Sequence, residues 1–280
     1  MNKLGCLGMG LLVSSGLLGC GAPVEGGPDT AEGPAANEEV GAVQQAIFPA
    51  EVGVVPMDGQ ACPAGTEVSF RLDVEDPPTD RVVIGCKTGA REGGYITAWV
   101  DRDVFWTQAP VTTSMCYHNF SMRFCRVDGN QFKRLLWGSN FTSYAVLQLS
   151  SACPEGSFAA SRFMDMEDDD NTNTSSGSLA PSVIDRNANL KFCVFGNTLG
   201  GNGPIMYSFP TLGGLKYAVF HDYDLSPQQT WVMKKKFIWS DDEDHANINS
   251  RNPATGIIAN ALAAMIEGTT DTFIEMAQVR

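Results

Sequence analysis

Basic side chains are scarce in this 280-residue chain, which has 19 lysines and arginines against 32 aspartates and glutamates. A formal net charge of −13 argues against nucleic acid and anionic lipid as partners, because both are recognised through basic patches. The cysteines form no CxxC pair, and the three histidines stand in unrelated contexts, so a zinc site is not expected. An acidic balance remains compatible with cation binding.

Motifs of hydrolytic enzymes are also missing. The chain contains no G-x-S-x-G, no H-E-x-x-H and no cysteine–histidine nucleophile pair. The apolar stretch Leu4–Leu18 is shorter than the roughly 20 residues that a membrane-spanning helix needs. These absences leave paired carboxylates as the catalytic alternative and argue against a spanning helix at this place.

Residues 1–19 are predicted to be an export signal. Lys3 supplies a positive charge before the apolar stretch. Leu17-Leu-Gly-Cys20 resembles the lipobox of bacterial lipoproteins, which implies cleavage before Cys20 and a lipid on its sulfur. By the same resemblance, Gly21 favours the outer membrane, so the expected place is the cell envelope, on its periplasmic or surface face. The alternative is an ordinary signal peptide with an incidental cysteine.

Residues 20–47 are predicted to be a disordered acidic tether. Glycine, proline, alanine and glutamate dominate this segment, and no aromatic residue occurs before Phe48. Such a composition cannot bury enough apolar surface to order itself. As a flexible coil the tether would span roughly 30 Å on average. It would hold the folded domain, predicted over residues 48–280, away from a lipid surface.

An acidic motif repeats within that domain. The pattern D-x-E-D-x-x-N-x-N occurs at Asp165–Asn173 and again at Asp241–Asn249. A degraded copy begins at Asp73-Val-Glu-Asp76, with Thr79 and Arg81 where the other copies have asparagine.

Other patches recur in the same order as the acidic motif. They are Cys62-Pro-Ala-Gly65 with Cys153-Pro-Glu-Gly156, Asn119–Cys125 with Asn187–Cys193, and Tyr144-Ala-Val-Leu147 with Tyr217-Ala-Val-Phe220. We therefore predict units at about 60–150, 151–229 and 230–280. The last is truncated and has Ala277 in place of a cysteine. The combination resembles uncharacterised secreted repeat proteins of bacteria such as myxobacteria over roughly residues 60–280, a resemblance that implies no activity.

Besides Cys6 in the signal and Cys20 at the lipobox, the chain has six cysteines, an even number as expected of an exported, disulfide-bonded chain. Both full units have a cysteine at two equivalent positions, one in the Cys-Pro-x-Gly patch and one at the end of the patch that begins with asparagine. The third unit lacks both cysteines. Loss in pairs is what a bond between them predicts. The predicted disulfides are Cys62–Cys125, Cys153–Cys193 and, by remainder, Cys86–Cys116.

The secondary structure is expected to be mainly β, with small helical inserts. Short runs rich in β-branched and aromatic residues predict strands at 67–72, 96–100, 122–127, 143–149, 190–195, 206–209, 217–220 and 235–239. Helical spacing of apolar residues predicts one helix at Thr255–Glu267. The expected fold class is a disulfide-bonded, sandwich- or barrel-like body made of pseudo-repeats, two full and one truncated.

The acidic copies offer the oxygen ligands that calcium prefers. The candidate metal ligands are Asp165, Glu167, Asp168, Asn171, Asn173, Asp241, Glu243, Asp244, Asn247 and Asn249. In the second copy, Met164 and Met166 would pack inward and project Asp165 and Glu167 outward together. The motif lacks the order of an EF-hand. An acidic turn that is solvated, or that caps its own backbone, is the equal alternative.

The sequence thus predicts a lipid-anchored binding or structural protein, with calcium as the candidate cofactor. Its expected partners are the membrane, through the anchor, and a glycan or another protein. The alternative is a secreted hydrolase that uses one acidic pair in the manner of a glycosidase. Recurrence counts against that alternative, because an active site is usually single whereas structural and ligand sites repeat.

Overall fold

A computed structural model of the chain describes residues 50–73, 95–96, 100–101, 115–116, 119–138, 140–166, 172–196, 203–221, 232–241, 248–252, 266–267 and 271–280. All of them belong to the second of two compact units, which are residues 1–42 and 43–280. The predicted signal peptide, Cys20 and the predicted tether lie outside the described residues.

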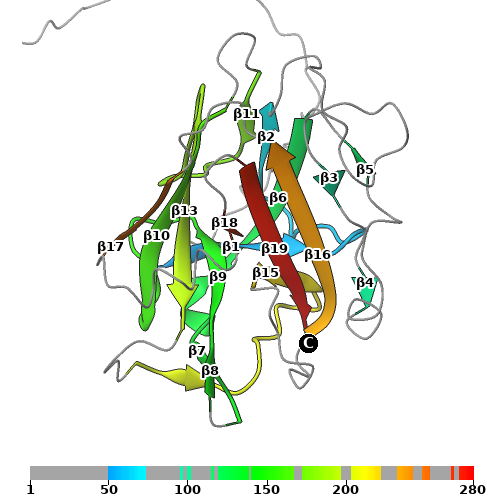
Figure 1. Cartoon of the computed structure of the whole chain (residues 1–280). Coiled ribbons are helices and arrows are strands. Elements are labelled where there is room, and N and C mark those ends of the chain that lie inside the picture. Colours follow the sequence, from blue (N-terminus) through cyan, green and yellow to red (C-terminus); the bar gives the residue numbers. More distant parts are fainter. Residues whose placement is uncertain are drawn as a thin grey trace, which may run out of the picture. The chain divides into compact units, whose positions relative to one another are not determined.

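The described residues fold almost entirely as antiparallel strands, which confirms the predicted mainly β class. Sixteen strands form one curled sheet (Figure 1). The smaller sheet consists of β7 (Arg134–Trp137), β8 (Asn140–Thr142) and β14 (Ile205–Met206). No helix in the described part of the chain is long and apolar enough to cross a membrane.

The described part of the chain shows none of the predicted helical inserts. Within the described residues the only helical turn is the 3-10 turn η2 (Gly129–Gln131). Residues 255–265 of the predicted helix lie outside the described residues, and its last two residues form strand β18 (Ile266–Glu267) instead. Ile266 pairs with Ile274 of the C-terminal strand, so pairing with the next strand of the chain overrides the helical pattern at this point.

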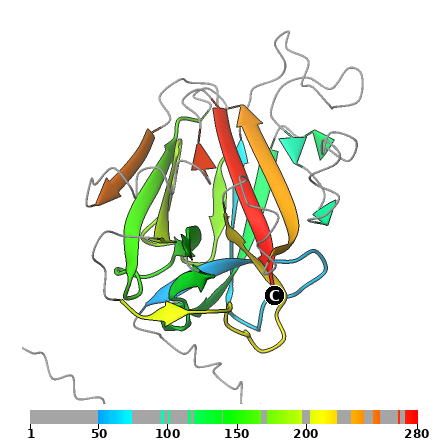
Figure 2. The same cartoon turned by 60° about the horizontal axis from the view of Figure 1, so that its bottom comes forward.

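Three times along the chain, the same set of three strands recurs. The first strands are β1 (Glu51–Pro56), β9 (Tyr144–Gln148) and β15 (Tyr217–Phe220). The second strands are β2 (Glu67–Asp73), β10 (Ser157–Met164) and β16 (Val232–Asp241). The third strands are β6 (Asn119–Asp128), β13 (Ala188–Phe195) and β19 (Asp271–Val279). Within each unit the third strand lies between the other two (Figures 1 and 2).

The registers of the three units coincide. Cys125 pairs with Val54 and Glu67, and Cys193 pairs with Val146 and Ala159. Ala277 pairs with Val219 and Lys235 in the same way, so it occupies the place of the two cysteines. The third unit therefore has all three strands, and the first unit includes β1, which precedes the predicted boundary near residue 60.

The three first strands pair with one another and so join the units. Val55 pairs with Ala218, Gly53 with Leu147, and Phe220 with Ala145. Each of the three strands has a small residue at the equivalent position of the repeat: Gly53, Ala145 and Ala218. A Cβ atom at Gly53 would lie 3.1 Å from the Phe124 Cβ and 3.2 Å from the Leu147 Cβ, closer than such atoms usually approach.

Both faces of the central strands are buried. The second and third strands of each unit form a hairpin, and one core lies between the three hairpins. There the Phe192 and Phe220 rings meet edge to face with centroids 5.1 Å apart. A second core covers the opposite face around Tyr144 and Tyr217, whose hydroxyls donate hydrogen bonds to the carbonyls of Lys133 and Pro210. Burial raises the pKa of both phenols. Double-sided burial explains why these strands are continuous apolar runs.

The repeated Cys-Pro-x-Gly patch forms the same turn in the first two units. Thr66 donates its backbone N–H to the Pro63 carbonyl, and Ser157 donates to that of Pro154. The glycine of each patch, Gly65 or Gly156, adopts a positive φ of 76° or 82°, which glycine tolerates best. Each turn positions its cysteine against the third strand. The predicted disulfides Cys62–Cys125 and Cys153–Cys193 are confirmed. Cys86 lies outside the described residues, so the third predicted bond stays a prediction.

Arg162 is buried in the core between the hairpins, with 1% of its surface exposed. It occupies the register held by Phe70 in the first unit and Ile238 in the third. Its Nη2 donates a hydrogen bond to the Thr272 hydroxyl of the third unit, at 2.5 Å. A buried guanidinium must keep its partners, because an unpaired charge in an apolar core is strongly unfavourable.

Removing either confirmed disulfide is expected to destabilise the folded state. The bonded cysteines are 63 and 40 residues apart, and the chain-entropy treatment assigns each bond about 4 kcal/mol. Paired Cys→Ala variants, Cys62 with Cys125 and Cys153 with Cys193, measure this in urea unfolding. Cys153→Ala/Cys193→Ala should still fold, because the third unit carries Ala277 at the same register. Unchanged unfolding midpoints would contradict the expectation.

Thr272→Val removes an acceptor from Arg162 while keeping the volume of the side chain. We expect a loss of about 1–3 kcal/mol in the free energy of unfolding, because a buried charged donor loses a partner. Thr272→Ser is the matched control, since it keeps the hydroxyl and should lose less. Equal losses in the two variants, measured by denaturant unfolding, would show that the hydrogen bond contributes nothing.

Candidate functional site

The acidic motif begins at the same structural position in all three units. Asp73 ends β2 and pairs with Asn119, and Asp241 ends β16 and pairs with Asp271. Asp165 directly follows β10, whose last residue pairs with Ala188, so its register partner is Asn187. The three aspartates therefore mark one end of the body, uppermost in Figure 1, which we call the acidic end.

The chain on both sides of Asp165 is anchored in the hydrophobic core. Met164 and Met166 are fully buried, as predicted, and Asp165 between them is half-buried. The backbone N–H of Met166 donates to the Asn187 Oδ1 at 2.8 Å. This bond ties the start of the acidic turn to the start of β13. The backbone at Asp165 is thus held by the apolar packing of its two neighbours and by this hydrogen bond.

Asn173, which follows the same acidic turn in the chain, is held by hydrogen bonds of its side chain. Its Nδ2 donates to the backbone carbonyls of Asp185 and Arg186, at 2.9 and 3.2 Å. The Asp185 carboxylate in turn accepts from the backbone N–H of Asn187 at 3.0 Å. We call the segment between the second and third strands of each unit its insert. The amide nitrogen of Asn173, a predicted metal ligand, therefore has a structural role, because it joins the start of the second unit's insert to its end.

Each insert that follows an acidic turn crosses to a neighbouring unit. The insert of the second unit adds β11 (Thr174–Ser176) to β2 of the first, and that of the third adds β17 (Ile248–Asn252) to β10 of the second. The insert of the first unit adds β3 (Tyr95–Ile96) and β4 (Val100–Asp101) to β16 of the third. The exchange runs in a closed cycle, which sequence reasoning missed because the partners are remote in the chain.

The crossing strands share one register. Ser175 pairs with Phe70, Asn249 with Arg162, and Ile96 with Ile238. Gly177, directly after β11, shows how closely the insert approaches the neighbouring unit. A Cβ atom on this glycine would lie 2.9 Å from the Val68 Cγ1.

The last asparagines of the two motif copies are not structurally equivalent. Because Ser175 corresponds to Asn249, Asn173 corresponds to Asn247. Asn249 lies within β17, inside a strand pairing, so the turn of the third unit is two residues shorter than that of the second. The matched spacing in the sequence therefore conceals an offset between the two turns.

The other predicted ligands lie outside the described residues: Glu167, Asp168, Asn171, Glu243, Asp244 and Asn247. No three histidine, cysteine, aspartate or glutamate side chains gather into a potential metal site within the part of the chain that the structure describes. The acidic end is thus defined by the aligned positions of Asp73, Asp165 and Asp241.

Comparisons of this chain with known protein families, curated proteins and solved structures found no match. Its function is therefore inferred from its own geometry.

Proposed function

We propose that this chain is an exported, lipid-anchored binding protein of the bacterial outer membrane, whose acidic end binds calcium and a glycan or protein partner. The observation that carries the proposal is the common register of Asp73, Asp165 and Asp241 at the ends of three equivalent strands. Threefold repetition of an acidic turn suits ligand presentation, in which several similar contacts act together.

Calcium binding would explain why each acidic turn brings several carboxylates close together. Two carboxylates about 4 Å apart repel by roughly 1 kcal/mol in water, and by several times more where they are partly shielded from it. Asp165 is half-buried, so its charge is only partly solvated. A hard cation would relieve this repulsion and accept the carboxylate and amide oxygens that the two full copies supply.

The geometry of the first unit suits a tethered protein. Glu51, at the start of β1, pairs with Asp128, the last residue of β6. Asn119, the first residue of β6, pairs with Asp73 at the acidic end. Ten residues of strand span about 33 Å. Glu51, near the first described residue, thus lies at the end of β6 opposite Asp73, which supports a binding end remote from the point where the described chain begins.

The two disulfides are consistent with a secreted protein, because such bonds persist in oxidising compartments. Lipidation at Cys20 would keep the exported protein at the envelope. One acyl chain alone binds membranes only marginally, whereas several chains anchor a protein stably. The acidic segment that follows would keep the body clear of anionic headgroups.

Calcium is expected to raise the melting temperature of the protein. At a calcium concentration 100 times the dissociation constant, one site stabilises the folded state by about 2.7 kcal/mol. Asp165→Ala/Asp241→Ala should abolish the rise, because both full motif copies lose their leading carboxylate. Differential scanning calorimetry with calcium and with chelator measures the effect, and calorimetric titration measures binding.

Asp73→Ala is the matched control, because its copy has Thr79 and Arg81 in place of the two asparagines. This variant should retain most of the calcium-dependent rise. Absence of both heat and melting shift in the wild type at millimolar calcium would refute the calcium site. The turns would then be solvated or self-capping.

Cys20→Ser is expected to move the protein from the membrane fraction to the soluble fraction of cells. The reason is the loss of the lipid-bearing sulfur that the lipobox resemblance assigns. Fractionation followed by detection of the protein measures the shift. Cys6→Ser, a change within the signal segment, is the control and should leave the distribution unchanged. Membrane partitioning of Cys20→Ser equal to that of the wild type would refute the anchor.

A further inference from the structure

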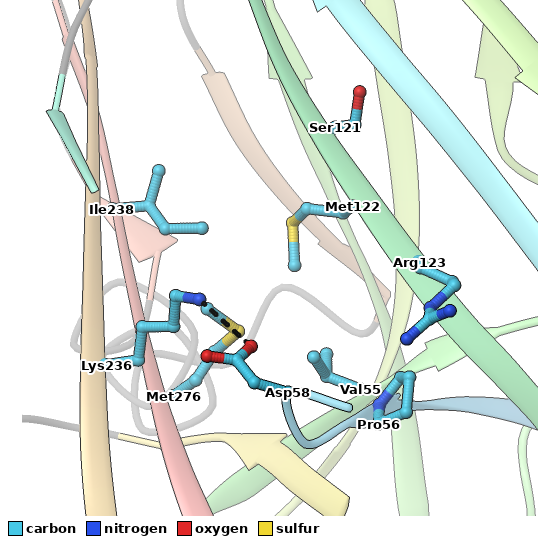
Figure 3. A pocket seen from close by; sticks show the side chains of 9 residues that line it. All are labelled: Val55, Pro56, Asp58, Ser121, Met122, Arg123, Lys236, Ile238 and Met276. Atoms are coloured by element: carbon cyan, nitrogen blue, oxygen red, sulfur yellow. Dashed lines mark ion pairs between the residues drawn. The ribbon is translucent and has the colours of Figure 1, made fainter. Parts of the chain in front are cut away.

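A cavity of about 140 Å³ lies between the first and third units. Its walls come from β1 and β6 of the first unit and from β16 and β19 of the third (Figure 3). Apolar side chains line much of it, and three charged side chains complete the lining. The lining residues are Val55, Pro56, Asp58, Ser121, Met122, Arg123, Lys236, Ile238 and Met276. None of them belongs to an acidic motif.

Lys236 occupies a position that the other two units fill with apolar residues. It pairs with Met276, as Val68 pairs with Phe124 and Ala160 pairs with Phe192. Val68 and Ala160 are buried in the core between the hairpins. The third unit thus combines a cation and a flexible methionine at a place where the repeat otherwise has a small apolar residue and a phenylalanine.

The Lys236 amine points into the cavity toward Asp58 (Figure 3). Its Nζ lies 3.7 Å from the Asp58 Oδ1, and its side chain is 16% exposed whereas that of Asp58 is 74% exposed. Burial lowers the pKa of the Lys236 amine, and the Asp58 carboxylate acts in the opposite direction. A buried ammonium is thus compensated by a carboxylate that reaches in from the surface.

Arg123 stands on the opposite wall of the same opening (Figure 3). Its Nη2 donates to the Gln60 carbonyl at 2.8 Å, and its Nη1 lies 3.6 Å from the Glu67 Oε2. The guanidinium is therefore held near the opening by its neighbours. Two cations, each beside a carboxylate, thus meet at one cavity of mixed polar and apolar lining in a chain of net charge −13. They are the groups that an anionic ligand would contact.

We propose that this cavity binds a small organic carboxylate, whose charged group replaces Asp58 beside Lys236. Its apolar part would lie against Met122, Ile238 and Met276. An engineered apolar cavity of about 150 Å³ accommodates benzene, so a ligand with one small ring or about six carbons fits the volume. In this arrangement the ligand carboxylate compensates the Lys236 charge from inside the cavity, and Arg123 adds attraction at the opening.

Benzoate is the test ligand, and benzamide is its neutral counterpart of the same shape. We expect the wild type to bind benzoate and to bind benzamide at least tenfold more weakly, because only benzoate compensates Lys236. Ligand-observed NMR and calorimetric titration measure both affinities. The titrations use the full chain in the presence of chelator, so that a failure of the calcium proposal cannot affect the result. Equal affinities for the two compounds would overturn the proposal.

Two variants test the assigned residues. Lys236→Met should weaken benzoate binding at least tenfold, and Lys191→Met, which removes a lysine from β13 of the second unit, should leave it unchanged. Asp58→Asn should strengthen binding several-fold, because the competing carboxylate is gone. Asp58 is mostly exposed, so this variant stays informative even if Lys236→Met fails to fold. Unchanged or weaker benzoate binding by Asp58→Asn would overturn the proposed replacement of Asp58.

Discussion

The close approach of β1, β9 and β15 is the constraint on which the rest of the structure depends. These strands pair with one another through the small residues Gly53, Ala145 and Ala218. At Gly53 even a Cβ atom would lie 3.2 Å from the Leu147 Cβ of the next unit. Each of these strands also pairs with the third strand of its own unit, so its position determines where the hairpin of that unit lies. Because the three hairpins share one register, features at equivalent residues reach the same end of the body.

The exchange of inserts makes each unit depend on another. A hairpin whose outer strand remained unpaired would present open hydrogen-bonding groups, an edge on which other chains can assemble. Here β11 covers β2, β17 covers β10, and β3 with β4 covers β16. The acidic turns lie where each chain segment leaves its own unit for a neighbour, so a ligand bound there would act on contacts between units.

Features that repeat in the sequence could be predicted, and features that depend on remote pairing could not. The pairings of Cys62 with Cys125 and of Cys153 with Cys193 followed from their recurrence, as did the place of Ala277. Strand β1 was not predicted, because residues Val52–Val55 share little beyond apolar character with the corresponding residues of β9 and β15. The buried Arg162 was missed because its packing depends on a remote unit of the chain. The strand at Ile266 was missed because its pairing with Ile274 overrides a helical pattern of apolar residues. The equal spacing of Asn173 and Asn249 was misleading, since turn lengths differ between units.

The insert of the first unit imposes an order on the maturation of this protein. Ile96 pairs with Ile238, 142 positions later in the chain, so the sheet of the first unit and that of the third are joined only after most of the polypeptide is available. Contacts this remote slow folding, because a long loop must close before they form. During synthesis, β3 would therefore have no partner strand in the third unit until β16 has been made.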